Sequence, residues 1–345
     1  MPLFSKLSIK LSTVAKKATF REKNMYDDLV IRLGKYDFEK VDFLGETSQY
    51  FDVSRECIYD GDVVLHGKLE KGIKVELSER GIKLSGSLCK FHLGDNFQTL
   101  HRSDTKRAIE RLSDTFHLPI GEGKVTRIDI AQNFILKQDL QEYYNHFGEL
   151  KDGNKRSSRV PITTENGLIS GLYYYQSNGL LVFYDKVKEQ TEKRQPIPEM
   201  YQNRNVLRYE QRYTGRLPKA FNVERVTASI LYDEQFYINI IDRWKSNYFK
   251  INKINDITIN LTAMKGIRDF NRMGILCMLE MFGGELALKE QVKEAQKMGN
   301  LSKDAAFDIR KAIDSACKEK IGITDRNDCI SELDKKIKEA VKFYR

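Results

Sequence analysis

Two strand-like segments each carry one carboxylate between apolar and basic residues. Residues 125–131 hold Asp129, and residues 206–212 hold Glu210. Side chains alternate between the two faces of a strand, so each carboxylate shares its face with cations of its own strand. Those cations are Arg127, Arg208 and Arg212. If the two strands pair in one sheet, both acids and several cations converge on one surface.

A third segment, residues 180–186, adds a nucleophile to this pattern. Tyr184 lies two residues before Lys186, so both share one face of the segment. A tyrosine beside carboxylates and cations suits metal-assisted phosphoryl transfer with tyrosine as the attacking group. Tyr184 is, however, one of 17 tyrosines, and a tyrosine at a strand end usually serves packing.

Each of these signals has a structural alternative. The acids are also compatible with cross-strand ion pairs, Asp129 with Arg208 or Glu210 with Arg127. An acid in the middle of both strands, on the same polar face, favours a site. The run Tyr173–Tyr175 is compatible either with packing or with stacking faces for single-stranded bases.

Bulk composition narrows the class of protein. The 345 residues carry a net charge of +9, which fits a polyanionic partner. The five cysteines are scattered and never spaced as CxxC, which argues against a zinc site or a disulfide framework and for a reducing cytoplasm. No apolar run approaches the length of a membrane span. Residues 1–24, with six basic residues and one acid, predict a mobile basic arm, although an organellar presequence has a similar composition.

Periodicity predicts an α+β domain followed by helices. We expect three parts: a basic arm at 1–24, an α+β domain at 25–250, to which the resemblance described next assigns nicking and DNA binding, and a helical domain at 251–345. Strands are predicted at 25–33, 62–69, 73–77, 82–88, 124–136, 171–175, 180–186 and 205–213. Helices are predicted at 103–116, 140–147, 185–193, 233–247, 263–281, 286–297, 303–318 and 330–344. A polar stretch at 149–166 is predicted as a loop or edge, and residues 86–97 either grip a nucleic-acid backbone or bend a strand.

Five ordered segments resemble the gene II/X type of replication initiator, found in filamentous phages and related bacterial plasmids. They are residues 90–96, 103–116, 126–133, 180–190 and 205–219. The resemblance covers roughly residues 25–245. It implies a central, largely antiparallel sheet with flanking helices, an RRM-like nicking core. It also implies a site-specific endonuclease and ligase that nicks one DNA strand and starts rolling-circle replication.

The resemblance also implies roles for individual residues. Tyr184 matches the nucleophile that becomes a 5′-phosphotyrosine, and Lys186 matches the basic residue after it. Asp129 and Glu210 match the acids that hold Mg²⁺ or Mn²⁺, and Asp185 is a further candidate ligand. The histidine pair of the wider nickase superfamily is absent here, which shifts metal binding to carboxylates. We expect four cations to position the DNA backbone: Lys90, Arg127, Arg208 and Arg212.

The expected setting is the cytoplasm of a bacterial host, with no membrane partner. The expected partners are single-stranded and double-stranded origin DNA and, through the freed 3′-hydroxyl, a host helicase and polymerase. Two alternatives stay open. One is a DNA-binding replication or copy-number regulator without chemistry, and the other is a metal-dependent nuclease in which activated water attacks and Tyr184 only packs.

Overall fold

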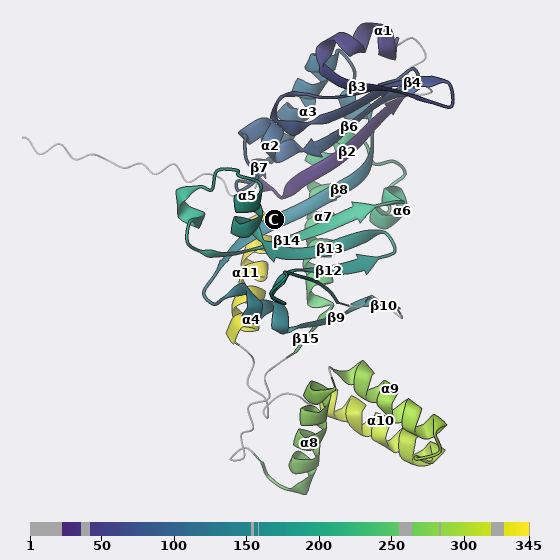
Figure 1. Ribbon diagram of the computed structural model, residues 1–345, viewed down its shortest axis with the longest axis vertical. Helices are drawn as coiled ribbons and strands as arrows, with labels where there is room; N and C mark the ends of the chain where they lie inside the picture. Colours follow the sequence, from purple (N-terminus) through teal and green to yellow (C-terminus); the bar gives the residue numbers. More distant parts are fainter. Residues whose placement is uncertain are drawn as a thin grey trace, which may run out of the picture.

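A ten-stranded sheet organises the chain in the computed structural model, which describes residues 23–35, 42–152, 155–157, 159–254, 264–282, 284–318 and 328–344. Every neighbouring pair of strands in this sheet is antiparallel. In spatial order the strands are β11 (Val160–Thr163), β12 (Ile169–Gln176), β13 (Gly179–Asp185), β14 (Asn205–Thr214), β8 (Lys124–Leu136), β2 (Tyr26–Gly34), β6 (Gly81–Ser87), β5 (Lys74–Ser78), β4 (Asp62–Lys68) and β3 (Asp52–Tyr59). The predicted α+β fold with an antiparallel sheet is confirmed (Figure 1).

Two small sheets complete the strand content of the described residues. One joins β10 (Lys155–Ser157), β9 (Phe147–Asp152) and β15 (Ile251–Lys253), and the other pairs β1 (Lys23–Asn24) with β7 (Leu100–His101). The stretch 149–166, predicted as a loop or edge, therefore contributes to three strands, and one of them, β11, is the edge of the main sheet. The predicted basic arm lies almost wholly outside the described residues.

One face of the sheet is apolar because alternate residues of its central strands are hydrophobic. Phe183 of β13 stacks on Tyr209 of β14 with ring centroids 4.6 Å apart, and Tyr209 stacks on Trp244 at 4.7 Å. Trp244 belongs to α7 (Glu234–Phe249), which crosses this face behind the strands in Figure 1. All three rings are fully buried, so they fix which residues of β13 and β14 point to the opposite face.

Shorter helices surround the sheet. They are α1 (Phe43–Thr47), α2 (Leu88–Leu93), α3 (Arg102–Phe116), α4 (Leu140–Asn145), α5 (Lys186–Glu192) and α6 (Leu217–Phe221). Residues 86–97 thus include the helix α2, which the sequence analysis did not predict. The Ser87 side chain accepts a hydrogen bond from the Lys90 backbone at its start, and Gly94 ends it in a left-handed conformation, φ 97°.

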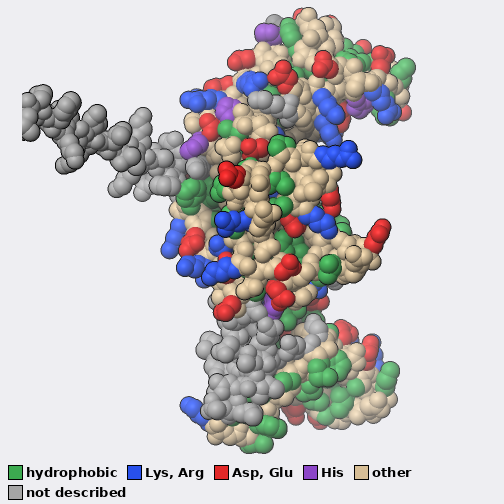
Figure 2. Space-filling model, turned by 60° about the vertical axis from the view of Figure 1, so that its left-hand side comes forward, with side chains coloured by type: hydrophobic (Ala, Val, Ile, Leu, Met, Phe, Trp, Pro, Cys, Tyr) green, Lys and Arg blue, Asp and Glu red, His purple; other side chains and the backbone are tan. Residues whose placement is uncertain are grey.

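The C-terminal helices divide into two groups. Helices α8 (Ile267–Met281), α9 (Glu285–Lys297) and α10 (Lys303–Lys318) share a small core of their own. Hydrophobic side chains remain exposed on this three-helix cluster, among them Phe270 and Phe307 (Figure 2). In contrast, α11 (Asp328–Tyr344) buries Leu333 and Ile337 in the main core, beside α7, β8 and α4. None of the helices in the described ranges combines the length and apolar character that crossing a membrane requires.

Candidate active site

On the polar face of the sheet the predicted residues lie in cross-strand rows, with Glu210 in the row between the two described next. In the first, Tyr184 of β13 lies directly opposite Arg208 of β14, which lies opposite Asn133 of β8. In the second, Arg212 lies between Leu180 of β13 and Asp129 of β8. Directly opposite residues of an antiparallel pair share one face. The three predicted strands therefore do bring Tyr184, Asp129 and Glu210 onto one surface.

A β-bulge in β2 adds two acids that the sequence analysis missed. Tyr26 pairs with Ile130 and Leu29 pairs with Ile128, so Asp27 and Asp28 together face the single residue Asp129. The sequence did contain a signal, because Tyr26 is out of phase with the apolar residues Leu29, Ile31 and Leu33 that follow the two acids. Two consecutive acids at a phase change indicate a bulge that turns both toward the polar face.

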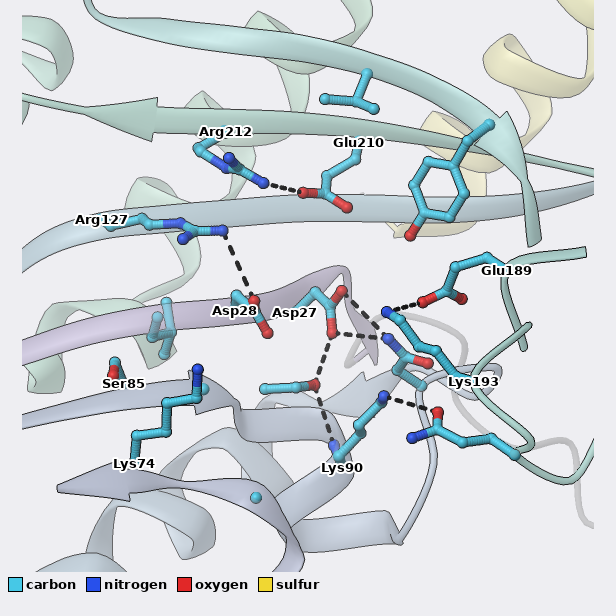
Figure 3. Close-up of a pocket in the computed structure, with 18 of the residues that line it drawn as sticks. Asp27, Asp28, Lys74, Ser85, Lys90, Arg127, Glu189, Lys193, Glu210 and Arg212 are labelled. Atoms are coloured by element: carbon cyan, nitrogen blue, oxygen red, sulfur yellow. Dashed lines mark hydrogen bonds and ion pairs between the residues drawn. The ribbon is translucent and has the colours of Figure 1, made fainter. Parts of the chain in front are cut away.

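Arginines bind these acids closely. Arg127 Nε donates to Asp129 Oδ1 at 2.8 Å and Arg212 Nε donates to Asp129 Oδ2 at 3.2 Å. Arg212 Nη2 also donates to Glu210 Oε1 at 3.2 Å (Figure 3). The two cross-strand ion pairs considered in the sequence analysis are wrong in their partners: Asp129 pairs across the strands with Arg212 and within its own strand with Arg127.

Asp27 and Arg208 form the buried floor of the site. Arg208 is 2% exposed, and its guanidinium donates to Asp27 Oδ2 and, at 3.0 Å, to Asn133 Oδ1. Ser87 Oγ donates to Asp27 Oδ1 at 2.6 Å. Burial raises the pKa of Asp27, but Arg208, Ser87 and Asn96 outweigh it and the net pKa is lowered. Asp27 is therefore a fixed negative charge, and Arg208 contributes its charge from beneath the surface.

Glu210 and Asp129 behave differently, because they crowd one another. Burial and the neighbouring Asp129 raise the pKa of Glu210 to about 7, and burial also raises the pKa of Asp129. Two carboxylates crowded together favour the protonated form of one of them. Burial and the neighbouring Asp27 raise the pKa of Asp28 to about 6. When all four acids are ionised, Asp27, Asp28, Asp129 and Glu210 carry one charge more than Arg127, Arg208 and Arg212 neutralise.

The remaining predicted residues lie around a cavity of about 830 Å³ on this face. Tyr184 lines it, and burial raises the pKa of its phenol well above the usual value, although Arg208 lowers it. Asp185 lines the cavity too, yet its Oδ1 caps α5 by accepting from the backbone of Val187 at 2.9 Å and Lys188 at 3.0 Å. Lys90 is at the rim, with its Nζ 3.3 Å from Gln195 Oε1 (Figure 3).

Lys186, like Asp129 and Arg208, does not line the cavity. Its side chain is fully buried, its Nζ donates to Glu189 Oε2 at 2.8 Å, and it lies 5.4 Å from the centre of the Phe97 ring. Burial and the nearby Arg208 lower the pKa of Lys186 to about 8. The structure therefore places this cation behind Tyr184, at the start of α5.

The carboxylate oxygens of this site are the type of ligand that a hard divalent cation such as Mg²⁺ prefers. Within the described part of the chain no three His, Cys, Asp or Glu side chains form a ready metal-holding group. Mg²⁺ is, however, commonly held by one or two carboxylates together with water and substrate phosphate oxygens. A cation bound here would offset the crowding of negative charge that raises the pKa of Glu210.

Comparison with known proteins places the chain in a family. Residues 49–247 match the family described as replication-associated protein G2P, N-terminal. No curated protein matches the chain. The matched range includes the whole of β8, β13 and β14, and with them Tyr184, Asp129 and Glu210. The match spans more than half of the chain, and it confirms the resemblance to gene II-type replication initiators noted in the sequence. The chain belongs to the G2P family of replication-associated proteins, initiators of the rolling-circle type.

Proposed function

We propose that this protein is a site-specific, single-strand DNA endonuclease and ligase that starts rolling-circle replication through a tyrosyl–DNA intermediate. One observation carries the proposal: Tyr184 lines the same cavity as the acids Asp27, Asp28 and Glu210. A phenol, an excess of carboxylates and surrounding cations are the parts that phosphoryl transfer to tyrosine requires.

In the proposed reaction the Tyr184 oxygen attacks the scissile phosphorus. The bond between phosphorus and the 3′-oxygen breaks, so the DNA 5′ end becomes linked to Tyr184 and the other end becomes a 3′-hydroxyl after taking a proton. The phosphotyrosine keeps the energy of the phosphodiester, so attack by a 3′-hydroxyl reverses the step and rejoins DNA without ATP. The 3′-hydroxyl is the primer that a host polymerase extends, with a host helicase opening the duplex.

The site supplies charge at each point of this reaction. Arg208, directly opposite Tyr184 and held by Asp27, stabilises the phenolate that attacks. Arg127 and Arg212 are 28% and 32% exposed at their side chains, so they can exchange a carboxylate for a backbone phosphate, and Lys90 extends this contact at the rim. Lys186 keeps Glu189 ionised and fixes the start of α5 behind the tyrosine.

Asp129 and Glu210 are the proposed ligands of Mg²⁺ or Mn²⁺, with Asp28 as a further candidate. Asp185 lines the same cavity but serves as the cap of α5. The bound ion would polarise the scissile phosphate and offset the charge that develops on it. Origin recognition needs further contacts, because phosphate contacts select little sequence. We assign the strand-nicking activity to residues 25–250 and duplex reading to the helices beyond residue 250.

A denaturing gel tests the proposal. The full-length protein is incubated with Mg²⁺ or Mn²⁺ and single-stranded oligonucleotides tiled across the DNA that surrounds its gene. We expect a covalent protein–DNA species that Tyr184→Phe abolishes while DNA binding survives. Tyr173→Phe is the matched control, because it removes another tyrosine hydroxyl from the same cavity. This variant keeps Tyr184 and should still form the adduct.

Other outcomes would contradict the proposal. Cleavage without a covalent species would favour the water-dependent nuclease. Metal-independent binding without cleavage would favour the regulator. An adduct that persists in Tyr184→Phe would show that another residue is the nucleophile.

A further inference from the structure

Beyond Tyr184, toward the sheet edge, the polar face changes from charged to apolar and aromatic. Tyr173 of β12 pairs with Val182 of β13 on one side and with Val160 of β11 on the other. Tyr175 pairs with Leu180, and Ile162 pairs with Gly171. These pairs place four side chains on the face that carries Tyr184, and we call them the edge patch: Val160, Ile162, Tyr173 and Tyr175.

This edge patch is open to solvent. Tyr175 is 60% exposed, Ile162 44% and Val160 37%, which is unusual for neighbouring apolar side chains on one surface. The rings of Tyr173 and Tyr175 have centroids 6.5 Å apart and planes inclined by 25°, so they present nearly parallel faces. Successive bases of a single strand stack on aromatic side chains arranged along a sheet in this way.

Gly171 connects the edge patch to the nucleophile. It lies opposite Tyr184, and a Cβ atom built on it would come within 3.5 Å of Tyr184 Cβ and 3.8 Å of Tyr173 Cε2. Because glycine has no side chain, the space between the two tyrosines stays open. Tyr173 and Tyr184 both line the cavity, so patch and cavity form one continuous surface.

The aromatic rings together with the cations of this surface favour nucleic acid over a protein partner. Four lysines line the same cavity, Lys74, Lys90, Lys188 and Lys193, and of these Lys193 pairs with Glu189. The edge strand is also poorly suited to accept a strand from another protein, because Pro161 removes one of its backbone donors. Exposed rings beside lysines match a chain of bases joined by phosphates.

We propose that Tyr173 and Tyr175, flanked by Val160 and Ile162, form a base-stacking platform that holds the unpaired nucleotides next to the phosphate attacked by Tyr184. The proposal deepens the proposed function and rests on it for the position of the scissile phosphate. On the polar face of the sheet, the edge strands would thus bind bases, and the central strands would carry the residues that act on the phosphate.

Fluorescence anisotropy with labelled (dT)12 tests the platform independently of nicking. For the full-length Tyr173→Ala/Tyr175→Ala variant we expect binding to weaken by roughly 5- to 150-fold per ring lost. The Tyr173→Phe/Tyr175→Phe variant keeps both rings and should bind within about twofold of wild type. The slope of affinity against salt should be unchanged in the alanine pair, since no cation is lost, and smaller in Lys188→Ala/Lys193→Ala.

A (dT)12 probe that carries abasic nucleotides supplies the second measurement. Removing bases should weaken binding to wild type and have little further effect on the alanine pair, because both changes remove the same contact. Equal losses in the two proteins, or an alanine pair that binds intact (dT)12 like wild type, would overturn the platform. Light scattering that shows a smaller assembly for the alanine pair would reassign the patch to a second copy of this chain.

The two proposals fail in different ways. If wild type forms the covalent adduct but the alanine pair binds (dT)12 normally, the platform is wrong and the nicking site stands. If no adduct forms with any DNA while stacking is lost in the alanine pair, the platform stands and the nicking proposal is wrong. Melting temperatures of all variants check that each is folded.

Discussion

Replacing Glu210 by glutamine is expected to stabilise the metal-free protein while it removes the proposed activity. Glu210 is 7% exposed, and its pKa is raised to about 7 from an ordinary value of 4.5. Folding therefore favours the protonated side chain. Between these two pKa values the folded protein binds more protons than the unfolded chain, so Glu210 lowers the free energy of unfolding increasingly as pH rises through this window.

The magnitude follows from the pKa change. One pKa unit corresponds to about 1.4 kcal/mol, so at pH 8 the ionised Glu210 costs the fold about 3 kcal/mol. At pH 5 most of that cost is absent, because the folded protein keeps Glu210 protonated. We thus expect Glu210→Gln to raise the free energy of unfolding by up to about 3 kcal/mol at pH 8 and by about 1 kcal/mol or less at pH 5.

Urea unfolding in EDTA, followed by circular dichroism at both pH values, measures this difference. Glu189→Gln is the matched control, with the opposite sign. Burial raises the pKa of Glu189, but bonds from Lys186 and Lys193 outweigh it and lower the pKa to about 2. Its ionised form therefore stabilises the fold above pH 4.5, and that gain is lost as pH falls toward 2.

One result would refute this reasoning. If Glu210→Gln destabilises the metal-free protein at pH 8 by more than about 1 kcal/mol, the bond from Arg212 outweighs the crowding by Asp129. The acid cluster would then be a structural ion-pair network rather than a site that stores negative charge for a cation.

Two further predictions concern the metal and the start of α5. Mg²⁺ should raise the melting temperature strongly at pH 8 and weakly at pH 5.5. At pH 5.5 protons compete with the ion for Asp28 and Glu210, because their pKa values are about 6 and 7. An equal shift at both pH values would argue against a carboxylate site. For the start of α5, Asp185→Ala should lose about 1 kcal/mol of stability as a helix cap, whereas Asp185→Asn keeps the cap, and an unchanged adduct yield in the asparagine variant would remove Asp185 from the metal ligands.

The sequence predicted the central strands well because their pattern is local. Alternation of apolar and polar residues set the face of Asp129, Tyr184 and Glu210, and the turn after Gln176 set the hairpin that carries Tyr184. Pairing of these strands then brought the three side chains together, as the shared polar face required. The direct partners of each residue were not predictable, since register depends on contacts between distant segments.

The parts that were missed depend on tertiary structure or on a broken pattern. The bulge at Asp27 and Asp28 interrupts the alternation that predicted the strand, so these acids were absent from the predicted site. The burial of Arg208 arises from Asp27, on a strand some 180 residues away in sequence. Helix α11 has an ordinary amphipathic pattern, which predicts a buried face but does not reveal that this face packs on α7 and β8.

Because α11 returns to the sheet, the three helices before it can vary in length and sequence among related proteins. Strand β15, before α8, pairs with β9 in the small three-stranded sheet, and helix α11, after α10, packs on β8 of the main sheet. The three helices between them therefore form an insertion that is anchored to the rest of the fold at both ends. Such an insertion can be exchanged or resized without interrupting the fold that carries the proposed site. Related initiators can therefore keep this fold and differ only in the three inserted helices.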